Sequence, residues 1–301
     1  MIIGDWEASK HLNEAYRYIR KMGLEANIAE LEAFGFTIIE DAVTQEEVER
    51  CKATVLAVAE RRLGCKLDID QTENLKGMIS GSPLLTNLLF EDVIFEDFLL
   101  KPGPQSVIGY LMGQSVKLHG LTSIIKSGGA DGMTLHTDID NGVPDPLPVY
   151  SCFGNLTYAL TDYTLEGGAL AMVPGSHRYC RHPNAQESVM TRGRENPLAI
   201  PVTAKAGSAI IWHGNTWHGA FARNTPGLRM SLTYSFCRQF LETQQPLKGR
   251  VPAEAWERHA GDDRFASLMG EYSLHGWQDD KNFVDTYSNP RRRQAGDDWY
   301  A

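Results

Sequence analysis

The stretch Arg229-Met-Ser-Leu-Thr-Tyr-Ser-Phe236 alternates between two kinds of side chain: its odd-numbered residues are polar and its even-numbered residues are apolar. Alternation with a period of two predicts a β-strand with one buried face. We expect the apolar face to pack under a layer of helices, and Arg229 and Ser231 to point into the mouth of a barrel. The obvious partner for this arginine is a bidentate carboxylate, although a structural salt bridge fits the sequence equally well.

Short runs of this kind recur through the middle of the chain and are separated by Gly, Pro, Asn and Asp. They lie at 115–125, 133–138, 150–160, 168–173, 200–203, 207–213 and 228–236. Many short strands with few helices between them predict a β-sandwich or jelly roll. The polar, unpatterned stretch 181–198 interrupts the series, and we expect it to form a long loop that acts as a lid.

The N-terminal third has a helical pattern instead. Thr44 and Glu47 form a capping-box signature at the start of a helix that ends near Gly64. Further elements are expected at 5–33 (helix, parted near Gly23), 35–40 (strand), 252–260 and 263–271 (helices). The predicted fold class is α+β, mainly β, in a single domain over 1–301, with 1–104 as mainly helical support, 105–240 as the β core and 241–301 as a C-terminal extension.

Composition limits the expected partners and compartment. The 301 residues include 29 Lys and Arg against 38 Asp and Glu, a net charge of -9. Nucleic acids and anionic membranes recruit basic surfaces, so we expect neither as a partner. The five scattered cysteines form no C-x-x-C pair, which indicates a reducing cytoplasm and argues against a disulfide framework. The N-terminus carries charges throughout, unlike a signal peptide, and no apolar run approaches membrane-spanning length.

A metal-binding pattern lies at Leu135-His-Thr-Asp-Ile-Asp140. Residues two apart on an extended chain share a face, so His136 and Asp138 can place a ring nitrogen and a carboxylate oxygen on one metal ion. A further histidine would complete a two-His-one-carboxylate triad, which leaves three positions open on non-haem Fe(II). Asp140 precedes Asn-Gly and is expected to shape that turn.

Two histidines in Ile211-Trp-His-Gly-Asn-Thr-Trp-His-Gly219 are candidates for the third ligand. His213 and His218 are an odd number of residues apart, so on one continuous strand they would face opposite sides. We expect a turn at Gly214-Asn215, with His213 ending one strand and His218 beginning the next region. The spacing alone leaves both histidines open as the ligand.

The order of these motifs resembles the Fe(II)/2-oxoglutarate oxygenases and, within them, the phytanoyl-CoA dioxygenase family. In both, H-x-D is followed by a distant histidine and then by an arginine within a short strand's reach. The resemblance covers most of the chain, and its most specific blocks are Ala206–His213 and His218–Asn224. Weaker agreement comes from residues 34–48 and from the turn Gly167–His177.

This resemblance implies a double-stranded β-helix, a jelly-roll or cupin-like core. It also implies that Fe(II) is held by His136, Asp138 and His218, and not by His213. The cosubstrate 2-oxoglutarate would chelate the iron through its 2-oxo acid end, with O2 as the oxidant. Arg229, helped by Ser231, would bind the distal carboxylate.

Other polar residues of the expected core receive weaker assignments. Asn155 and Thr157 share one face of a strand, where we expect them to contact the cosubstrate. Lys126 precedes a Gly-Gly turn and is expected to be a solvated lysine at a strand end. His177, in the sequence Pro-Gly-Ser-His, is expected to be a structural turn residue.

The activity implied is that of a dioxygenase which oxidises an unactivated C–H bond of a small, partly apolar metabolite of secondary metabolism and releases succinate and CO2. Hydroxylation is the expected outcome, with desaturation, cyclisation and endoperoxidation left open. Halogenation is not expected, because halogenases of this type replace the carboxylate at the Asp138 position with a small residue. The alternatives are an acyl-CoA hydroxylase of the same family, a metal-dependent cupin enzyme without 2-oxoglutarate, and a non-catalytic small-molecule binder. A homodimer is left open.

Overall fold

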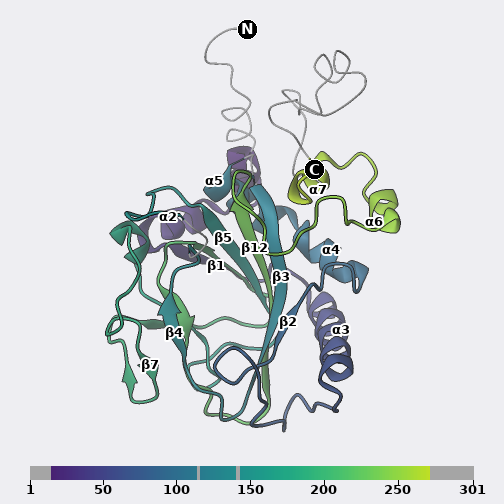
Figure 1. Ribbon diagram of the computed structural model, residues 1–301. Coiled ribbons are helices and arrows are strands. Elements are labelled where there is room, and N and C mark those ends of the chain that lie inside the picture. The colour runs from purple at the N-terminus through teal and green to yellow at the C-terminus, as the bar shows by residue number, and fades with distance from the viewer. Residues whose placement is uncertain (1–14, 114–115, 140–142, 272–301) are drawn as a thin grey trace.

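The computed structural model describes residues 15–113, 116–139 and 143–271. Its core consists of two antiparallel sheets, with strand orders β1-β10-β5-β12-β3-β2 and β4-β11-β6-β9 (Figure 1). Their facing arrangement is the predicted double-stranded β-helix. The strands are β1 (Phe36–Ile39), β2 (Leu84–Thr86), β3 (Val116–Ser127), β4 (Met133–His136), β5 (Phe153–Ala159), β6 (Leu170–Met172), β9 (Ile200–Val202), β10 (Ala209–His213), β11 (His218–Ala220) and β12 (Leu228–Arg238), with a small hairpin of β7 (Met190–Thr191) and β8 (Arg194–Glu195).

Helices cover the outer face of the larger sheet. These are α3 (Gln45–Leu63), α4 (Val93–Leu99) and α5 (Pro102–Met112). The apolar, even-numbered residues 230–236 of β12 are fully buried in one cluster with apolar side chains of all three helices. Tyr158 and Tyr234 complete their burial by donating hydrogen bonds to the Phe98 and Phe95 carbonyls, at 2.8 and 2.7 Å. The alternation of β12 therefore predicted correctly which face meets the helices.

Most predicted elements are confirmed, with differences at their edges. The seven predicted strands of the core match β3, β4, β5, β6, β9, β10 and β12. The capping box is present: Thr44 Oγ1 accepts from the Glu47 N–H, and the Glu47 carboxylate accepts from the Thr44 N–H at 2.8 Å. Residues 15–21 and α2 (Glu25–Phe34) are helical on either side of Gly23, as expected. Residues 5–14, Asp140 and 272–301 lie outside the described residues.

The residues just after the expected boundary at 105 are still helical, and the first strand of the series begins close to its predicted start at 115. Helix α5 runs through residue 105 to Met112, and β3 starts at Val116. Pro102 and Pro104 lie in the first turn of α5, which tolerates proline because its N–H groups have no intrahelical partner there. Helices α6 (Ala253–Arg258) and α7 (Asp263–Leu268) agree with the predicted C-terminal pair.

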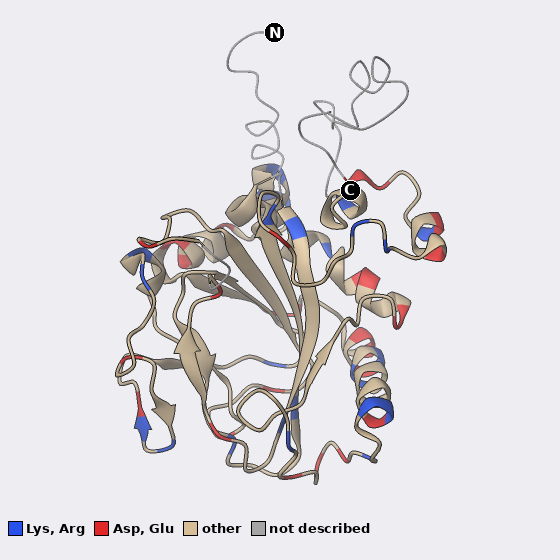
Figure 2. Ribbon diagram, viewed as in Figure 1, with Lys and Arg blue, Asp and Glu red and all other residues tan. Residues whose placement is uncertain are grey.

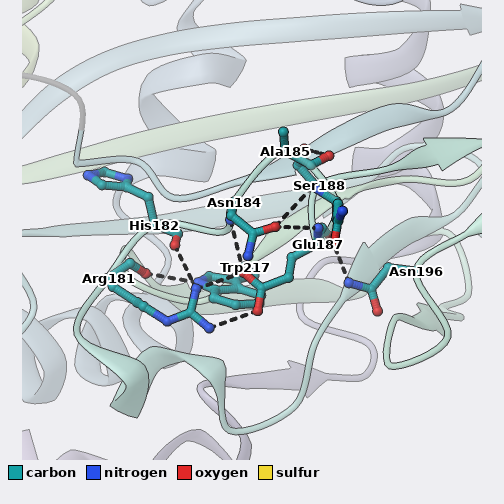
Figure 3. A network of polar contacts seen from close by, with 9 residues as sticks. Arg181, His182, Asn184, Ala185, Glu187, Ser188, Asn196 and Trp217 are labelled. Atoms are coloured by element: carbon teal, nitrogen blue, oxygen red, sulfur yellow. Dashed lines mark hydrogen bonds and ion pairs between the residues drawn. The ribbon is translucent and has the colours of Figure 1, made fainter.

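The polar stretch 181–198 contains the β7–β8 hairpin and an internal network that ties it to Trp217 (Figure 3). Arg181 donates two hydrogen bonds to the Glu187 carboxylate, at 2.7 and 2.8 Å, and its guanidinium lies 4.7 Å from the Trp217 ring centroid. The Asn196 amide donates to the Glu187 carbonyl at 2.6 Å. These contacts give a segment without sequence periodicity a definite conformation.

The same loop is attached to β4, the strand that carries His136. The Leu135 N–H donates to the Ser188 carbonyl at 2.9 Å, and Thr137 Oγ1 lies 2.7 Å from His182 Nδ1. The loop therefore backs the strand that carries the H-x-D pattern. Its role as a lid stays a prediction.

Charged residues of both signs alternate along α3 and the surface loops, whereas the central strands are largely uncharged (Figure 2). All five cysteines are free thiols. Within residues 15–113, 116–139 and 143–271, no helix is both long and apolar enough to cross a bilayer.

Candidate active site

Strands β4 and β11 of the smaller sheet bring His136, Asp138 and His218 together, so that one ligand atom from each lies within 4.8 Å of the others. His136 ends β4 and His218 begins β11, and the two are register partners. Their rings are 4.3 Å apart between centroids, and His218 Nε2 lies 3.5 Å from Asp138 Oδ1. Gly219 permits this approach, since a Cβ there would lie 2.3 Å from the Met133 carbonyl.

Both histidines present Nε2 to the centre of this cluster. A carbonyl oxygen can only accept, so Nδ1–H of His218 donates to the Thr216 carbonyl at 2.9 Å and Nδ1–H of His136 to the Thr134 carbonyl at 3.0 Å. Burial, with the neighbouring His136, lowers the pKa of His218 to about 4, and Asp138 only partly opposes this shift. The Nε2 lone pair is therefore free at neutral pH, which suits a metal ligand.

His213 is not part of this cluster. It ends β10, as predicted, and both ring nitrogens are used within the protein: Nδ1 accepts from the Asn215 N–H at 3.0 Å, and Nε2 lies 3.3 Å from the Val149 carbonyl. Burial and the nearby His177 lower the pKa of His213 to about 4. His177 lies in a short 3-10 turn beside it, with ring centroids 5.5 Å apart. Both have the surroundings of buried structural histidines.

A cavity of about 260 Å³ opens from the three clustered residues into the space between the sheets. Arg229 also lines the cavity, is only 2% exposed and lies over the Tyr163 ring at 4.6 Å. Its Nε and Nη1 atoms have no hydrogen-bond partner among the described residues. A buried guanidinium with unused donors is costly unless a ligand supplies an acceptor. The alternative of a structural salt bridge with a described carboxylate is therefore wrong.

Lys126 lies directly across from Arg229 in the β3–β12 pairing. The expectation of a solvated strand-end lysine was wrong: Lys126 is 2% exposed, because β3 continues to Ser127 and turns this side chain inward. Burial, with Arg229 and Arg223 nearby, lowers its pKa to about 7, and its Nζ donates to the Asp131 carbonyl at 2.6 Å. Arg223 is satisfied by three backbone carbonyls. Of these three cations, Arg229 is the one with nitrogen atoms that have no partner among the described residues.

The weaker sequence candidates line the cavity but have partners inside the protein. Asn155 donates to Asp138 Oδ2 at 2.7 Å, and Thr157 Oγ1 lies 2.7 Å from Thr233 Oγ1. The Ser231 hydroxyl lies between the N–H and the carbonyl of Ile124, at 3.2 and 3.3 Å. Direct contact of these three groups with a cosubstrate stays a prediction.

Several residues of the cavity wall were not predicted from the sequence. Trp212 packs its ring 5.1 Å from that of His218, and its buried Nε1–H has no partner in the described part of the chain. Residues 79–84 form another wall, and Gln244 approaches from the C-terminal side. Trp212 faces the cavity because β10 pairs it with the inward-facing Asn155, a relation that the sequence alone does not show. Residues 79–84 carry no pattern that points to the cavity.

Comparison with known proteins agrees with this geometry. The model of the phytanoyl-CoA dioxygenase (PhyH) family matches residues 31–231. Dioxygenase FUM3 from Gibberella moniliformis is 23% identical over 226 residues, covering 70% of this chain and 71% of that protein.

Solved structures share the fold at low sequence identity. HygX from Streptomyces hygroscopicus, with nickel, 2-oxoglutarate and hygromycin B bound, has a TM-score of 0.59 at 16% identity, covering 73% of this chain and 90% of HygX. The epimerase SnoN from nogalamycin biosynthesis, in complex with Fe3+, alpha ketoglutarate and nogalamycin RO, has a TM-score of 0.54 at 20% identity, covering 77% of this chain and 91% of SnoN. These proteins bind a metal and 2-oxoglutarate, and this chain has a His-Asp-His cluster that could bind a metal. The chain belongs to the phytanoyl-CoA dioxygenase family and is a non-haem iron oxygenase.

Proposed function

We propose that the protein is an Fe(II)- and 2-oxoglutarate-dependent dioxygenase that oxidises an unactivated C–H bond of a small, uncharged and partly apolar metabolite. One observation carries the proposal: a single cavity joins the His136–Asp138–His218 cluster to the buried Arg229, whose Nε and Nη1 have no partner. A metal-chelating group at one end and a carboxylate at the other describe the two ends of 2-oxoglutarate.

The residues present fit this pair of ligands. Two histidines and a carboxylate form a donor set suited to Fe(II), and the recess lined by Arg229 and Lys126 suits the distal carboxylate. Bound iron and cosubstrate would supply the oxidising chemistry. The protein's part is to hold both in a buried space, to orient the distal carboxylate through Arg229, and to keep bulk water out.

The proposed substrate class follows from the cavity-lining side chains that are not assigned to the metal or to 2-oxoglutarate. Among the described residues, the charged side chains lining the cavity belong to the metal cluster, Lys126 and Arg229. The remaining wall consists of apolar, hydroxyl and amide side chains, including Ile79, Leu84 and Met133. A charged group on the substrate would therefore have no opposite charge to meet there. This supports a small, uncharged natural product more than an acyl-CoA, whose diphosphate needs cations.

The sharpest test is substrate-stimulated succinate release by the protein reconstituted with Fe(II). A panel should contain uncharged natural products, amino-acid derivatives and acyl-CoA thioesters, with His218→Ala as the inactive control. We expect uncharged, partly apolar compounds to raise succinate release and to gain one oxygen or lose two hydrogens. Stimulation by acyl-CoA alone would overturn the substrate class, and no 2-oxoglutarate consumption under any condition would overturn the proposed function.

A further inference from the structure

The two carboxylate oxygens of Asp138 have different surroundings. Oδ1 lies 3.5 Å from His218 Nε2 and so faces the other two residues of the metal cluster. Oδ2 accepts a hydrogen bond from Asn155 Nδ2 at 2.7 Å. Asn155 is 2% exposed and belongs to β5, a strand of the opposite sheet. The carboxylate therefore has one oxygen free for a metal and one engaged by the protein.

A third residue, Ser235, contacts the other end of the Asn155 amide. Ser235 Oγ donates to Asn155 Oδ1 at 2.6 Å, and Ser235 is the register partner of Asn155 on β12. The Asp138 carboxylate can only accept, so the Asn155 atom directed at it must be the amide nitrogen, and the amide oxygen then accepts from the Ser235 hydroxyl. The opposite orientation would place two oxygens 2.7 Å apart without a proton between them. Ser235, Asn155 and Asp138 thus form a directed chain of hydrogen bonds.

The hydrogen bonds from Ser235 to Asn155 and from Asn155 to Asp138 determine how many coordination positions of a metal Asp138 can occupy. A carboxylate that binds a metal through both oxygens takes two positions, and with two histidines it leaves only two of six. The chelating end of 2-oxoglutarate needs two positions, and the oxidant needs a third. Because Asn155 engages Oδ2, only Oδ1 is available, and three positions stay open.

We propose that Asn155, oriented by Ser235, is a positioning residue that keeps Asp138 monodentate and so preserves the third open position on iron. The inference rests on the proposed function and adds to it a role for two residues that do not themselves bind the metal. It replaces the expectation that Asn155 contacts the cosubstrate directly, because its amide nitrogen and oxygen are engaged by Asp138 and Ser235. Removing the amide should release Oδ2 to compete with the cosubstrate.

The test compares Asn155→Leu, which keeps the approximate shape, with Ser235→Ala, which leaves the amide but frees its orientation. Asn27→Leu is the matched control, since it removes an amide that donates to Thr37 Oγ1 and the Ile38 carbonyl on the far side of β10. Three quantities are measured anaerobically: Fe(II) affinity, 2-oxoglutarate affinity, and the metal-to-ligand charge-transfer absorption that reports chelation by 2-oxoglutarate.

For Asn155→Leu we expect undiminished Fe(II) affinity, at least about tenfold weaker 2-oxoglutarate binding and a reduced charge-transfer absorption, since a hydrogen bond to a charged group is lost. Ser235→Ala should weaken 2-oxoglutarate binding and the charge-transfer absorption in the same direction but to a smaller extent. If Asn155→Leu fails to fold, Ser235→Ala alone tests the inference. A general structural defect would instead lower the affinities for metal and cosubstrate together, which would overturn the inference. Wild-type 2-oxoglutarate affinity and absorption in a folded variant would overturn it as well. Absence of the absorption in the unmutated protein would count against the proposed function itself.

Discussion

Replacing Arg229 with methionine should abolish tight 2-oxoglutarate binding without destabilising the free protein. Methionine nearly conserves the volume of the buried stem, and a swap of that kind usually costs less than about 1.5 kcal/mol. Arg229 also lies opposite Lys126, and like charges directly opposite each other destabilise a pair of strands. Removing one of the two cations should therefore offset part of any loss of packing.

The effect of Arg229→Met on 2-oxoglutarate binding should be large, in contrast to its small effect on the stability of the free protein. A carboxylate left without its buried guanidinium loses on the order of 2–5 kcal/mol, so the Kd should rise at least about thirtyfold. At a cosubstrate concentration of about 100 times the wild-type Kd, binding stabilises the wild-type protein by about 2.7 kcal/mol. A thirtyfold weaker variant at the same concentration retains only about 0.9 kcal/mol of that stabilisation.

Both effects can be read from denaturant unfolding with and without 2-oxoglutarate, with Arg229→Lys as the control that keeps the charge but loses the planar fork. We expect the lysine variant to fall between the other two proteins in affinity. Unchanged 2-oxoglutarate affinity in Arg229→Met would refute the assignment. A loss of several kcal/mol in the ligand-free protein would refute the reasoning differently, because it would show that Arg229 stabilises the fold rather than a ligand.

Four further outcomes are expected. His218→Ala should lose Fe(II) binding in a metal titration, whereas His213→Ala should keep the metal and lose stability on the order of 1–3 kcal/mol from its broken buried hydrogen bonds; the reverse pattern would mean that the wrong histidine was assigned. The affinity for 2-oxoglutarate should fall as pH rises above about 7, because Lys126, with its pKa of about 7, loses its proton there and an anion binds the protonated form better; calorimetry of Lys126→Met should give a flatter profile, and identical profiles would exclude this lysine. Protease cutting within 181–198 should slow when iron, cosubstrate and substrate are all present, whereas equal cutting in both states would leave the loop without a lid role. Turnover in excess chloride should give an oxygenated or desaturated product by mass, since Asp138 holds the position that a halide would need; a halogenated main product would contradict this.

The sequence predicted those parts of the site that depend on local periodicity. Strand parity placed His136 beside Asp138, and the alternation of β12 placed Arg229 on the inner face. The turn at Gly214-Asn215 separated His213 from His218, although the spacing alone did not choose between them and the family resemblance did. Each of these inferences needs only the geometry of one strand or one turn.

The missed features depend on pairing between strands that are distant in sequence. Lys126 looked like a solvated lysine because nothing near it in the chain shows that Arg229 lies opposite. The two hydrogen-bond partners of Asn155, Asp138 and Ser235, could not be predicted because they come from a distant loop and a distant strand. Hydrogen-bond partners of this kind are set by register across a sheet, which a single sequence does not encode in any local pattern.

Buried polar atoms without partners occur in several places among the described residues, for example at Ser123 and Ser208, and also along the cavity. The Arg223 guanidinium, the Asn155 amide and the Ser231 hydroxyl have partners within the protein. Arg229 and Trp212 retain buried N–H groups without partners, and both line the cavity that begins at the metal cluster. A core selected only for stability would replace such groups, because each unsatisfied donor costs about 1–3 kcal/mol. Their presence along one cavity is explained if acceptors arrive with a ligand, so that part of the stability of the free protein is given up for binding.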